Sequence, residues 1–126
     1  MSVVEWRKSG KSVAMTVEEI AEKVGGKVEV AVEGAAADSV YTSDLLSDVM
    51  GHAGEGAALV TIQNHLNTIA VCTLVGTEVI VICHNRPIPD DMRAAAAREG
   101  VAIVVTPLCQ YAASLALATL PPGIKG

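Results

Sequence analysis

The sequence predicts a three-layer α/β/α sandwich built on a mainly parallel sheet of about five strands. Strand segments alternate with helical segments, which is the pattern of βαβ units joined into a parallel sheet. Residues 78–83 and 101–106 are apolar at nearly every position, as expected for strands covered by helices on both faces. The 126 residues are enough for one domain with its own core.

The first helix is predicted at residues 16–24, where Thr16 and Glu19 form a capping box and Gly25 ends the helix. Apolar residues at helical spacing define its inner face: Val17, Ile20, Ala21 and Val24. A strand follows at residues 27–32, because polar and apolar residues alternate there. Residues 33–40 are predicted to form a turn that leads into a short strand.

A short helix is predicted from Ser43, which is a typical N-cap residue, to the glycines near residue 54. We expect its inward residues to be Leu45, Leu46, Val49 and Met50. Next come a strand at 57–63 and a helix at 64–76 that is capped by Asn64. The inner stripe expected for that helix is Leu66, Ile69, Ala70, Thr73 and Leu74.

The remaining elements are two strands and two helices. The strand at 78–83 leads to a helix at 89–100, which begins at Pro89 with two acidic residues. The strand at 101–106 leads to a helix at 107–120, with Pro107 in its first position. We therefore expect a flexible extension at 1–14, a folded domain at 15–120 and a tail at 121–126.

Composition limits the classes of function. A net charge of -5 and a pI near 5.0 argue against a nucleic-acid partner. No apolar run approaches the ~18 residues of a membrane span, and three cysteines fit reduced thiols in the cytoplasm. The chain is 51% apolar with a mean hydropathy of +0.43. We expect an exposed apolar patch that is closed by self-association, most simply as a homodimer.

Polar side chains gather after the predicted strands, where ligands bind in open α/β sheets. The predicted ligand-binding residues are Ser43, Asp44, Asn64, His65, His84, Asn85 and Arg86. The guanidinium group of Arg86 and the free N–H groups of helix N-termini suit a phosphate or a carboxylate. The sequence therefore predicts a site for a small anionic metabolite or nucleotide.

A structural interpretation of the same residues is also open. Ser43 and Asn64 are good N-caps, and Asp44 in a first helical turn favours the helix dipole. Histidines such as His65 and His84 often lie on surface loops without a ligand, and Arg86 beside a proline can simply be solvated.

Catalytic and metal sites are not predicted, and neither is a cofactor. Cys83, His84 and Asn85 are neighbours in sequence, so their side chains cannot converge as a triad. The cysteines and histidines lack the close-spaced pairs of structural zinc sites, and we expect Cys109 to face inward. An enzyme that uses His65 or His84 is the remaining catalytic alternative.

The segment Tyr41–Met50, with the sequence YTSDLLSDVM, resembles the part of DRTGG domains that follows the name-giving motif. Three later segments are similar to strand–helix units of the same family: 59–71, 79–92 and 100–117. The resemblance as a whole spans roughly residues 15–120. DRTGG domains occur in some phosphotransacetylases and between CBS domains in some inorganic pyrophosphatases. They are similar to the N-terminal domain of HPr kinase/phosphorylase. The resemblance implies a regulatory or assembly domain that pairs with itself and has no defined catalytic residue.

The name-giving motif itself falls near residues 35–40, where only Asp38 is retained. The kinase chemistry of the HPr relative resides in a separate P-loop domain, so the resemblance does not imply a kinase. From the polar cluster and this resemblance together, we predict a non-enzymatic, ligand-sensing domain. The alternative is an assembly subunit of a larger metabolic enzyme system. That system could be linked to a hydrogenase, because some stand-alone members of the family are encoded near iron-only hydrogenase genes.

Overall fold

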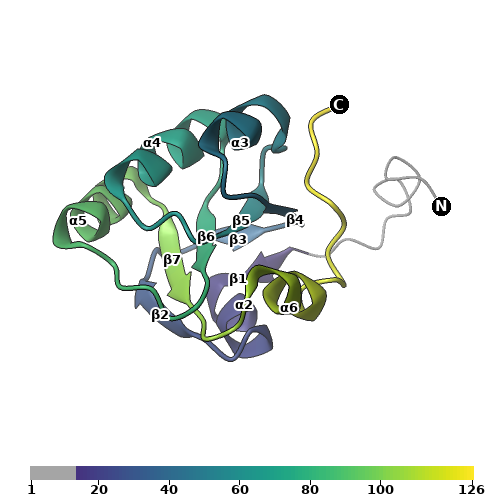
Figure 1. Ribbon diagram of the computed structural model, residues 1–126, viewed down its shortest axis with the longest axis horizontal. Helices are drawn as coiled ribbons and strands as arrows, with labels where there is room; N and C mark the ends of the chain where they lie inside the picture. Colours follow the sequence, from purple (N-terminus) through teal and green to yellow (C-terminus); the bar gives the residue numbers. More distant parts are fainter. Residues whose placement is uncertain (1–13) are drawn as a thin grey trace.

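A five-stranded sheet forms the centre of the molecule, as the computed structural model shows for residues 14–126 (Figure 1). Its strands, in spatial order, are β2 (Lys27–Val30), β7 (Ala102–Val105), β6 (Val79–Ile82), β5 (Ala57–Thr61) and β4 (Ser39–Thr42). Four of them run parallel, and only the edge strand β2 is antiparallel to its neighbour. The predicted sheet is therefore confirmed.

Helices cover both faces of this sheet, which confirms the three-layer sandwich. One face carries α2 (Val17–Lys23) and α6 (Gln110–Ala116). The other face carries α3 (Leu46–His52), α4 (Leu66–Val75) and α5 (Asp90–Glu99). A second, two-stranded sheet joins β1 (Met15–Thr16) to β3 (Ala36–Ala37).

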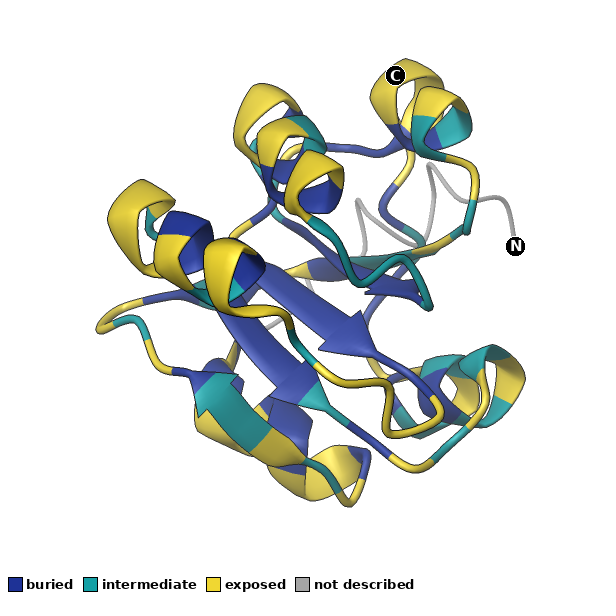
Figure 2. Cartoon of the chain, turned by 60° about the vertical axis from the view of Figure 1, so that its left-hand side comes forward, coloured by how far each residue is buried: buried dark blue, intermediate teal, exposed yellow. Residues whose placement is uncertain are grey.

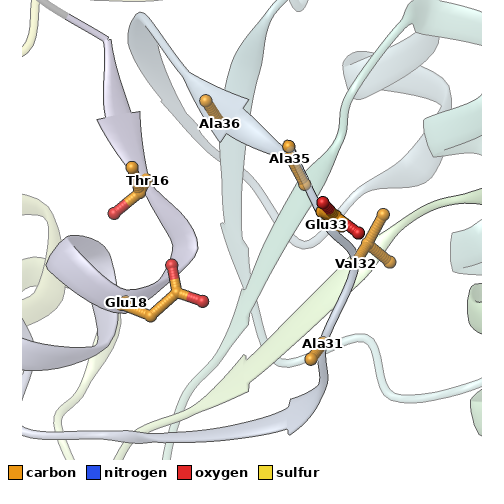
Figure 3. A pocket seen from close by; sticks show the side chains of 8 residues that line it. Thr16, Glu18, Ala31, Val32, Glu33, Ala35 and Ala36 are labelled. Carbon is orange, nitrogen blue, oxygen red and sulfur yellow. The ribbon is translucent and has the colours of Figure 1, made fainter.

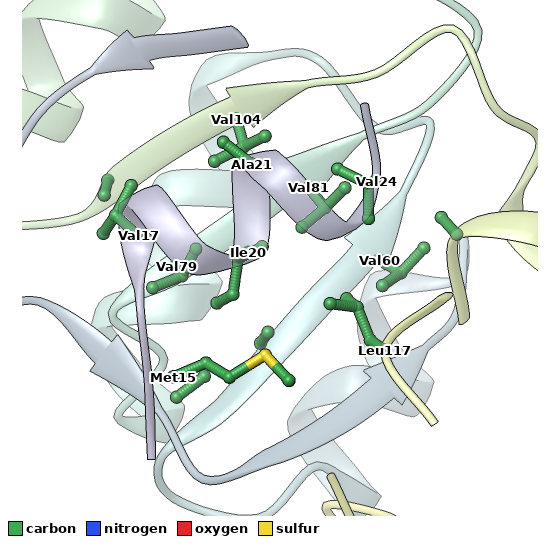
Figure 4. Packing of buried hydrophobic residues seen from close by; sticks show 14 of the residues in the cluster. Met15, Val17, Ile20, Ala21, Val24, Val60, Val79, Val81, Val104 and Leu117 are labelled. Carbon is green, nitrogen blue, oxygen red and sulfur yellow. The ribbon is translucent and has the colours of Figure 1, made fainter. Parts of the chain in front are cut away.

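Strand β6 divides the core between the two helical layers. Its residues Val79 and Val81 pack toward α2 and α6, while Ile80 and Ile82 pack toward the other three helices. Successive strand side chains point to opposite faces, and all four are fully buried because helices cover both faces of the sheet. Figure 4 shows the first of these packing layers, with Ile20 of α2 close to the valines of β6.

Helix α2 forms as the sequence predicts. The backbone N–H of Glu19 donates to Thr16 Oγ1 at 3.1 Å, and the N–H of Thr16 donates to Glu19 Oε1 at 3.0 Å. Acidic and basic side chains mark its solvent face, so the apolar spacing identifies a single inner face. The side chains predicted to face inward are all buried: Val17, Ile20, Ala21 and Val24.

Helix α4 is rotated relative to the prediction. Of the predicted inner stripe only Ile69 is buried, and Leu66 and Leu74 are 44% and 68% exposed. The buried residues are Thr68, Ile69, Cys72 and Val75. Thr68 can face inward because its hydroxyl donates to the carbonyl oxygen of Gln63 at 2.8 Å. The prediction was wrong because the apolar residues of α4 itself occur on all sides of the helix, so its sequence does not define a single inner face.

The helices α3 and α6 also differ from the prediction. Helix α3 starts at Leu46, and Leu45 and Met50 are exposed rather than inward, while Val49 is buried as expected. Helix α6 starts only at Gln110, so Pro107 is not its first residue.

The prediction for the side chain of Cys109 was also wrong. Cys109 is the N-cap residue of α6 and is exposed, which corrects the inward placement expected from the sequence.

The last residues of the chain lie beside the edge strand β4 (Figure 1). The backbone N–H of Val40 donates to the carbonyl oxygen of Pro121, and the N–H of Gly123 donates to the carbonyl oxygen of Val40. The predicted extension at residues 1–14 lies almost wholly outside the described residues. From residue 14 onward, no helix combines the length and hydropathy needed to cross a membrane.

Candidate functional site

Asp44 connects three segments at the carboxyl edge of the sheet. It lies between β4 and α3, and its Oδ1 accepts hydrogen bonds from Thr61 Oγ1 at 3.0 Å and from the N–H of Ile62 at 2.9 Å. Its Oδ2 accepts from Gln110 Nε2, in the first turn of α6, at 2.6 Å. Both carboxylate oxygens are therefore occupied by donors from the protein itself.

Gln63 links this carboxylate loop to His65. Its Nε2 donates to the carbonyl oxygen of Asp44 at 2.6 Å, and its Oε1 lies 2.7 Å from His65 Nε2. Gln63 and Gln110 were not among the predicted site residues. The sequence does contain a signal for them. Asp44 follows β4, Gln63 follows β5 and Gln110 follows β7, and these three parallel strands end at the same edge of the sheet.

Arg86 and Asn64 form a second contact between loops. Arg86 Nε and Nη2 donate to Asn64 Oδ1 at 3.2 and 3.0 Å, and Asn64 Nδ2 donates to the carbonyl oxygen of Pro87 at 2.6 Å. The ion pairs found among residues 14–126 do not include Arg86, which is exposed. Its charge is therefore held in place by an amide and is not neutralised by a carboxylate.

The predicted N-caps are wrong at two helices. Asn64 contacts Arg86 and Pro87, and the N-cap position of α4 belongs to His65, whose side chain makes no capping hydrogen bond. Ser43 Oγ accepts from the N–H of Leu45 at 3.2 Å in a local turn, and Ser43 lies two residues before Leu45, which is the N-cap residue of α3. The first N–H groups of α4 thus lack a side-chain acceptor.

His84 and Asn85 form a tight turn after β6. Both have left-handed backbones, with φ of 59° and 51°, and the N–H of Arg86 donates to the carbonyl oxygen of Cys83 at 3.3 Å. Two successive positive φ values are the mark of a type I′ turn, and asparagine tolerates this conformation well. Both side chains are exposed and have no hydrogen-bond partner among the described residues.

The geometry thus divides the predicted residues into separate groups. Asp44 and His65 belong to one hydrogen-bonded network through Gln63, while Asn64 and Arg86 form another. The remaining predicted residues make no side-chain hydrogen bond to either network: Ser43, His84 and Asn85.

Cys83 lies directly after β6 and is fully buried, as the sequence predicts. Burial raises the pKa of its thiol to about 11, and the negative charges of Asp44 and Cys109 act in the same direction. The thiolate needed for nucleophilic attack is therefore strongly disfavoured near neutral pH. Among residues 14–126, no group of three or more His, Cys, Asp or Glu side chains is placed to hold a metal ion.

A hollow of about 380 Å³ lies elsewhere, between the start of α2 and the loop of residues 31–36 (Figure 3). The charged side chains that line it are Glu18 and Glu33. Because both are acidic, this hollow is unsuited to an anion, unlike the corner around Arg86.

A comparison with solved structures gives an informative match. No known protein family matches the sequence, and neither does any curated protein. The fold is similar to a crystal structure of the CBS and DRTGG domains of the regulatory region of Clostridium perfringens pyrophosphatase, complexed with its activator diadenosine tetraphosphate. The TM-score is 0.71 at 13% sequence identity, over 84% of this chain and 47% of that chain. The likeness shows a DRTGG-like fold, and this chain spans about half of that protein region.

Proposed function

We propose that this chain is a non-catalytic regulatory domain that binds a small anion, such as a nucleotide or a metabolite phosphate, beside Arg86. The observation that carries the proposal is the exposed guanidinium group of Arg86, which has no carboxylate partner among residues 14–126. Asn64 fixes this group two residues before α4, a helix whose N-cap side chain makes no capping hydrogen bond. Positioned arginine and free helix N–H groups together are the usual elements of a phosphate site.

Each predicted site residue has a part in this proposal. Arg86 and the N-terminus of α4 supply the positive charge, and Asn64 positions the guanidinium group. His84 and Asn85 project from the adjacent turn and are free to contact the ligand.

Asp44 acts indirectly in this proposal. Donors from its own protein occupy its oxygens, so in this proposal it holds the loops in place and does not itself contact the ligand. Ser43 and His65 support the same loops through their bonds to Leu45 and Gln63.

The fold and the sequence resemblance both support a regulatory role and a place in the DRTGG family. The similar pyrophosphatase structure is a regulatory region, and that protein is complexed with a nucleotide activator. A small α/β domain with this fold is therefore a suitable receptor for a soluble effector.

Differential scanning fluorimetry and calorimetry with ATP, ADP, acetyl phosphate and inorganic phosphate would test the proposal. We expect at least one of these anions to raise the melting temperature, because a ligand that binds only the folded state stabilises it. Arg86→Ala should lose about tenfold or more in affinity, since charge-assisted hydrogen bonds are among the strongest.

Arg98→Ala is the control, because it removes another exposed arginine, in the last turn of helix α5, away from the loop that holds Arg86. Its ligand response should equal that of the wild type. If none of the anions binds, or if both variants bind as well as the wild type, the sensing proposal is wrong.

An assembly subunit without a small ligand is the second candidate. The mutual hydrogen bonds of Asp44, Gln63 and Gln110 favour it, because a network that is already satisfied needs no ligand. Large apolar side chains are also exposed on several helices, including Leu45, Leu74, Tyr111 and Leu115. A partner captured by the purified chain, together with a negative ligand screen, would favour this candidate.

A further inference from the structure

The hollow between the start of α2 and the loop of residues 31–36 combines apolar and acidic side chains (Figure 3). Glu18 lies on one side of it and Glu33 on the other, and the remaining lining is small or apolar: Thr16, Ala31, Val32, Ala35 and Ala36. Its volume is about 380 Å³. Pockets of roughly 300–1,000 Å³ hold whole small molecules, so there is room for one indole ring. The hollow therefore suits an occupant that joins an apolar group to positive charge.

The two carboxylates of this hollow have no partner in the part of the chain that the structure describes. Within residues 14–126, neither Glu18 nor Glu33 takes part in an ion pair or a side-chain hydrogen bond. Both residues are exposed. Two negative charges that face one hollow repel each other, and a cationic occupant between them replaces that repulsion by attraction.

Residues 1–13 of the same chain have the complementary chemistry. They hold three of the nine Lys and Arg residues and one of the 14 acidic residues, so residues 14–126 hold six basic and 13 acidic residues. The three basic residues are Arg7, Lys8 and Lys11. Arg7 directly follows Trp6, the only tryptophan of the chain. Tryptophan and arginine are the side chains that most often anchor a protein contact.

This N-terminal segment joins the domain beside the hollow. Thr16 lines the hollow, and it pairs with Ala36 of β3, which lines the hollow as well. Trp6 and Ala14 are eight residues apart, so the chain between them spans at most about 28 Å. Ser9 and Gly10 within that stretch favour the turn that brings the segment back toward the domain. A tether this short gives an effective concentration of millimolar order, so a contact of low intrinsic affinity is sufficient.

We propose that residues 1–13 dock in this hollow of their own domain. The indole ring of Trp6 packs against the apolar lining, and the side chains of Arg7 and Lys8 pair with the two carboxylates. Docking neutralises Glu18 and Glu33 and closes the hollow to other cations. It does not depend on the proposed anion site, which lies at the carboxyl edge of the sheet.

The single tryptophan makes docking directly measurable by fluorescence. In the wild type we expect Trp6 to emit at a shorter wavelength than in denaturant and to resist quenching by acrylamide, because a docked indole ring is shielded from water. Glu33→Lys should raise the quenching constant, and Glu18→Lys/Glu33→Lys should raise it by about twofold or more, since attraction becomes repulsion. Sodium chloride at about 0.5 M should act in the same direction, because salt screens exposed charges.

Asp90→Lys is the matched control for Glu18→Lys. It makes the same charge change at an exposed residue in the first turn of a helix. Helix α5, which carries Asp90, covers the other face of the sheet from α2, with the buried strands between them (Figure 2). The quenching constant of this variant should equal that of the wild type.

A charge exchange tests the pairing itself. Arg7→Glu/Lys8→Glu should release Trp6, because four negative charges then meet at the hollow. Combining it with Glu18→Lys/Glu33→Lys reverses both sides, and the quenching constant should return to near the wild-type value. Circular dichroism would check that each variant is folded.

Three results would overturn the proposal: wild-type emission and quenching equal to those in denaturant, quenching that Glu18→Lys/Glu33→Lys leaves unchanged, or an exchanged variant no better protected than its parents. A quenching constant that falls as protein concentration rises would place the segment in a second copy, and it would overturn docking within one chain. Arg86→Ala should quench as the wild type does, so loss of anion binding and loss of docking are separately measurable.

Discussion

At the scale of single residues, Asp44 is the side chain on which most of the carboxyl-edge geometry depends. Asp44→Ala removes the acceptor for Thr61, Ile62 and Gln110, and the hydroxyl of Thr61 is fully buried. We expect the free energy of unfolding to fall by about 2–4 kcal/mol, because hydrogen bonds to a charged group are lost and a buried donor is left unpaired. Urea denaturation would measure the loss.

Glu33→Ala is the control for this prediction, since it removes an exposed loop carboxylate and should change stability by less than about 0.5 kcal/mol. An Asp44→Ala protein as stable as this control would show that the network is dispensable.

The three thiols should differ sharply in reactivity. Cys109 is exposed, whereas burial raises the pKa of Cys72 to about 12 and that of Cys83 to about 11. At pH 8 about one in a thousand Cys83 thiols is ionised, and burial also excludes the reagent. An aromatic disulfide reagent should therefore label Cys109 rapidly in the folded protein, and it should label all three thiols only in denaturant. Rapid labelling that survives Cys109→Ser would contradict this.

At the scale of elements, the sequence predicts a helix face only where charge marks the opposite side. In α2, Glu18, Glu22 and Lys23 leave one possible inner face, and that face is the one observed. In α4 the apolar residues occur all around the axis, so only tertiary packing decides which of them is buried. The inward position of Thr68 depends on a carbonyl oxygen outside the helix, which no local pattern reveals.

The packing of the C-terminal segment against β4 gives a prediction at the same scale. A Cβ atom on Gly123 would lie 2.5 Å from Ala57 Cβ and 2.8 Å from Ser39 Oγ. Gly123→Ala should therefore displace residues 121–125 and expose the N–H of Val40, which donates to Pro121. Hydrogen exchange at Val40 should accelerate, and the free energy of unfolding should fall by about 1–3 kcal/mol, as for other overpacked sites.

Gly51→Ala is the control, because a Cβ atom there meets nothing within 4 Å and the residue lies inside helix α3. It should raise stability by up to about 1 kcal/mol through helix propensity. Unchanged exchange at Val40 in Gly123→Ala would show that the segment is not held by this contact.

At the scale of the whole molecule, the layered fold and its mainly parallel sheet could be predicted from the sequence, and the individual contacts of the site could not. The alternation of strands and helices fixes which loops share the carboxyl edge, so Asp44, Asn64 and Arg86 were expected near one another. The hydrogen-bond partner of each side chain depends on how the side chain is rotated and on small differences in the distance between neighbouring loops. That is why Asn64 contacts Arg86 although a helix cap was expected.

The two helical layers share the strands of one sheet, so we expect them to unfold together. Ile20 of α2 and Ile80 of β6 are both fully buried, in the cores on opposite sides of the sheet. Ile20→Val and Ile80→Val should each lower the free energy of unfolding by about 0.5–1.5 kcal/mol. The double variant should show their sum within about 0.5 kcal/mol, because the side chains pack in separate clusters. Each variant should retain one transition, with circular dichroism and hydrogen exchange giving the same stability. A variant that loses one helical layer before the other would show instead that the two cores are independent units.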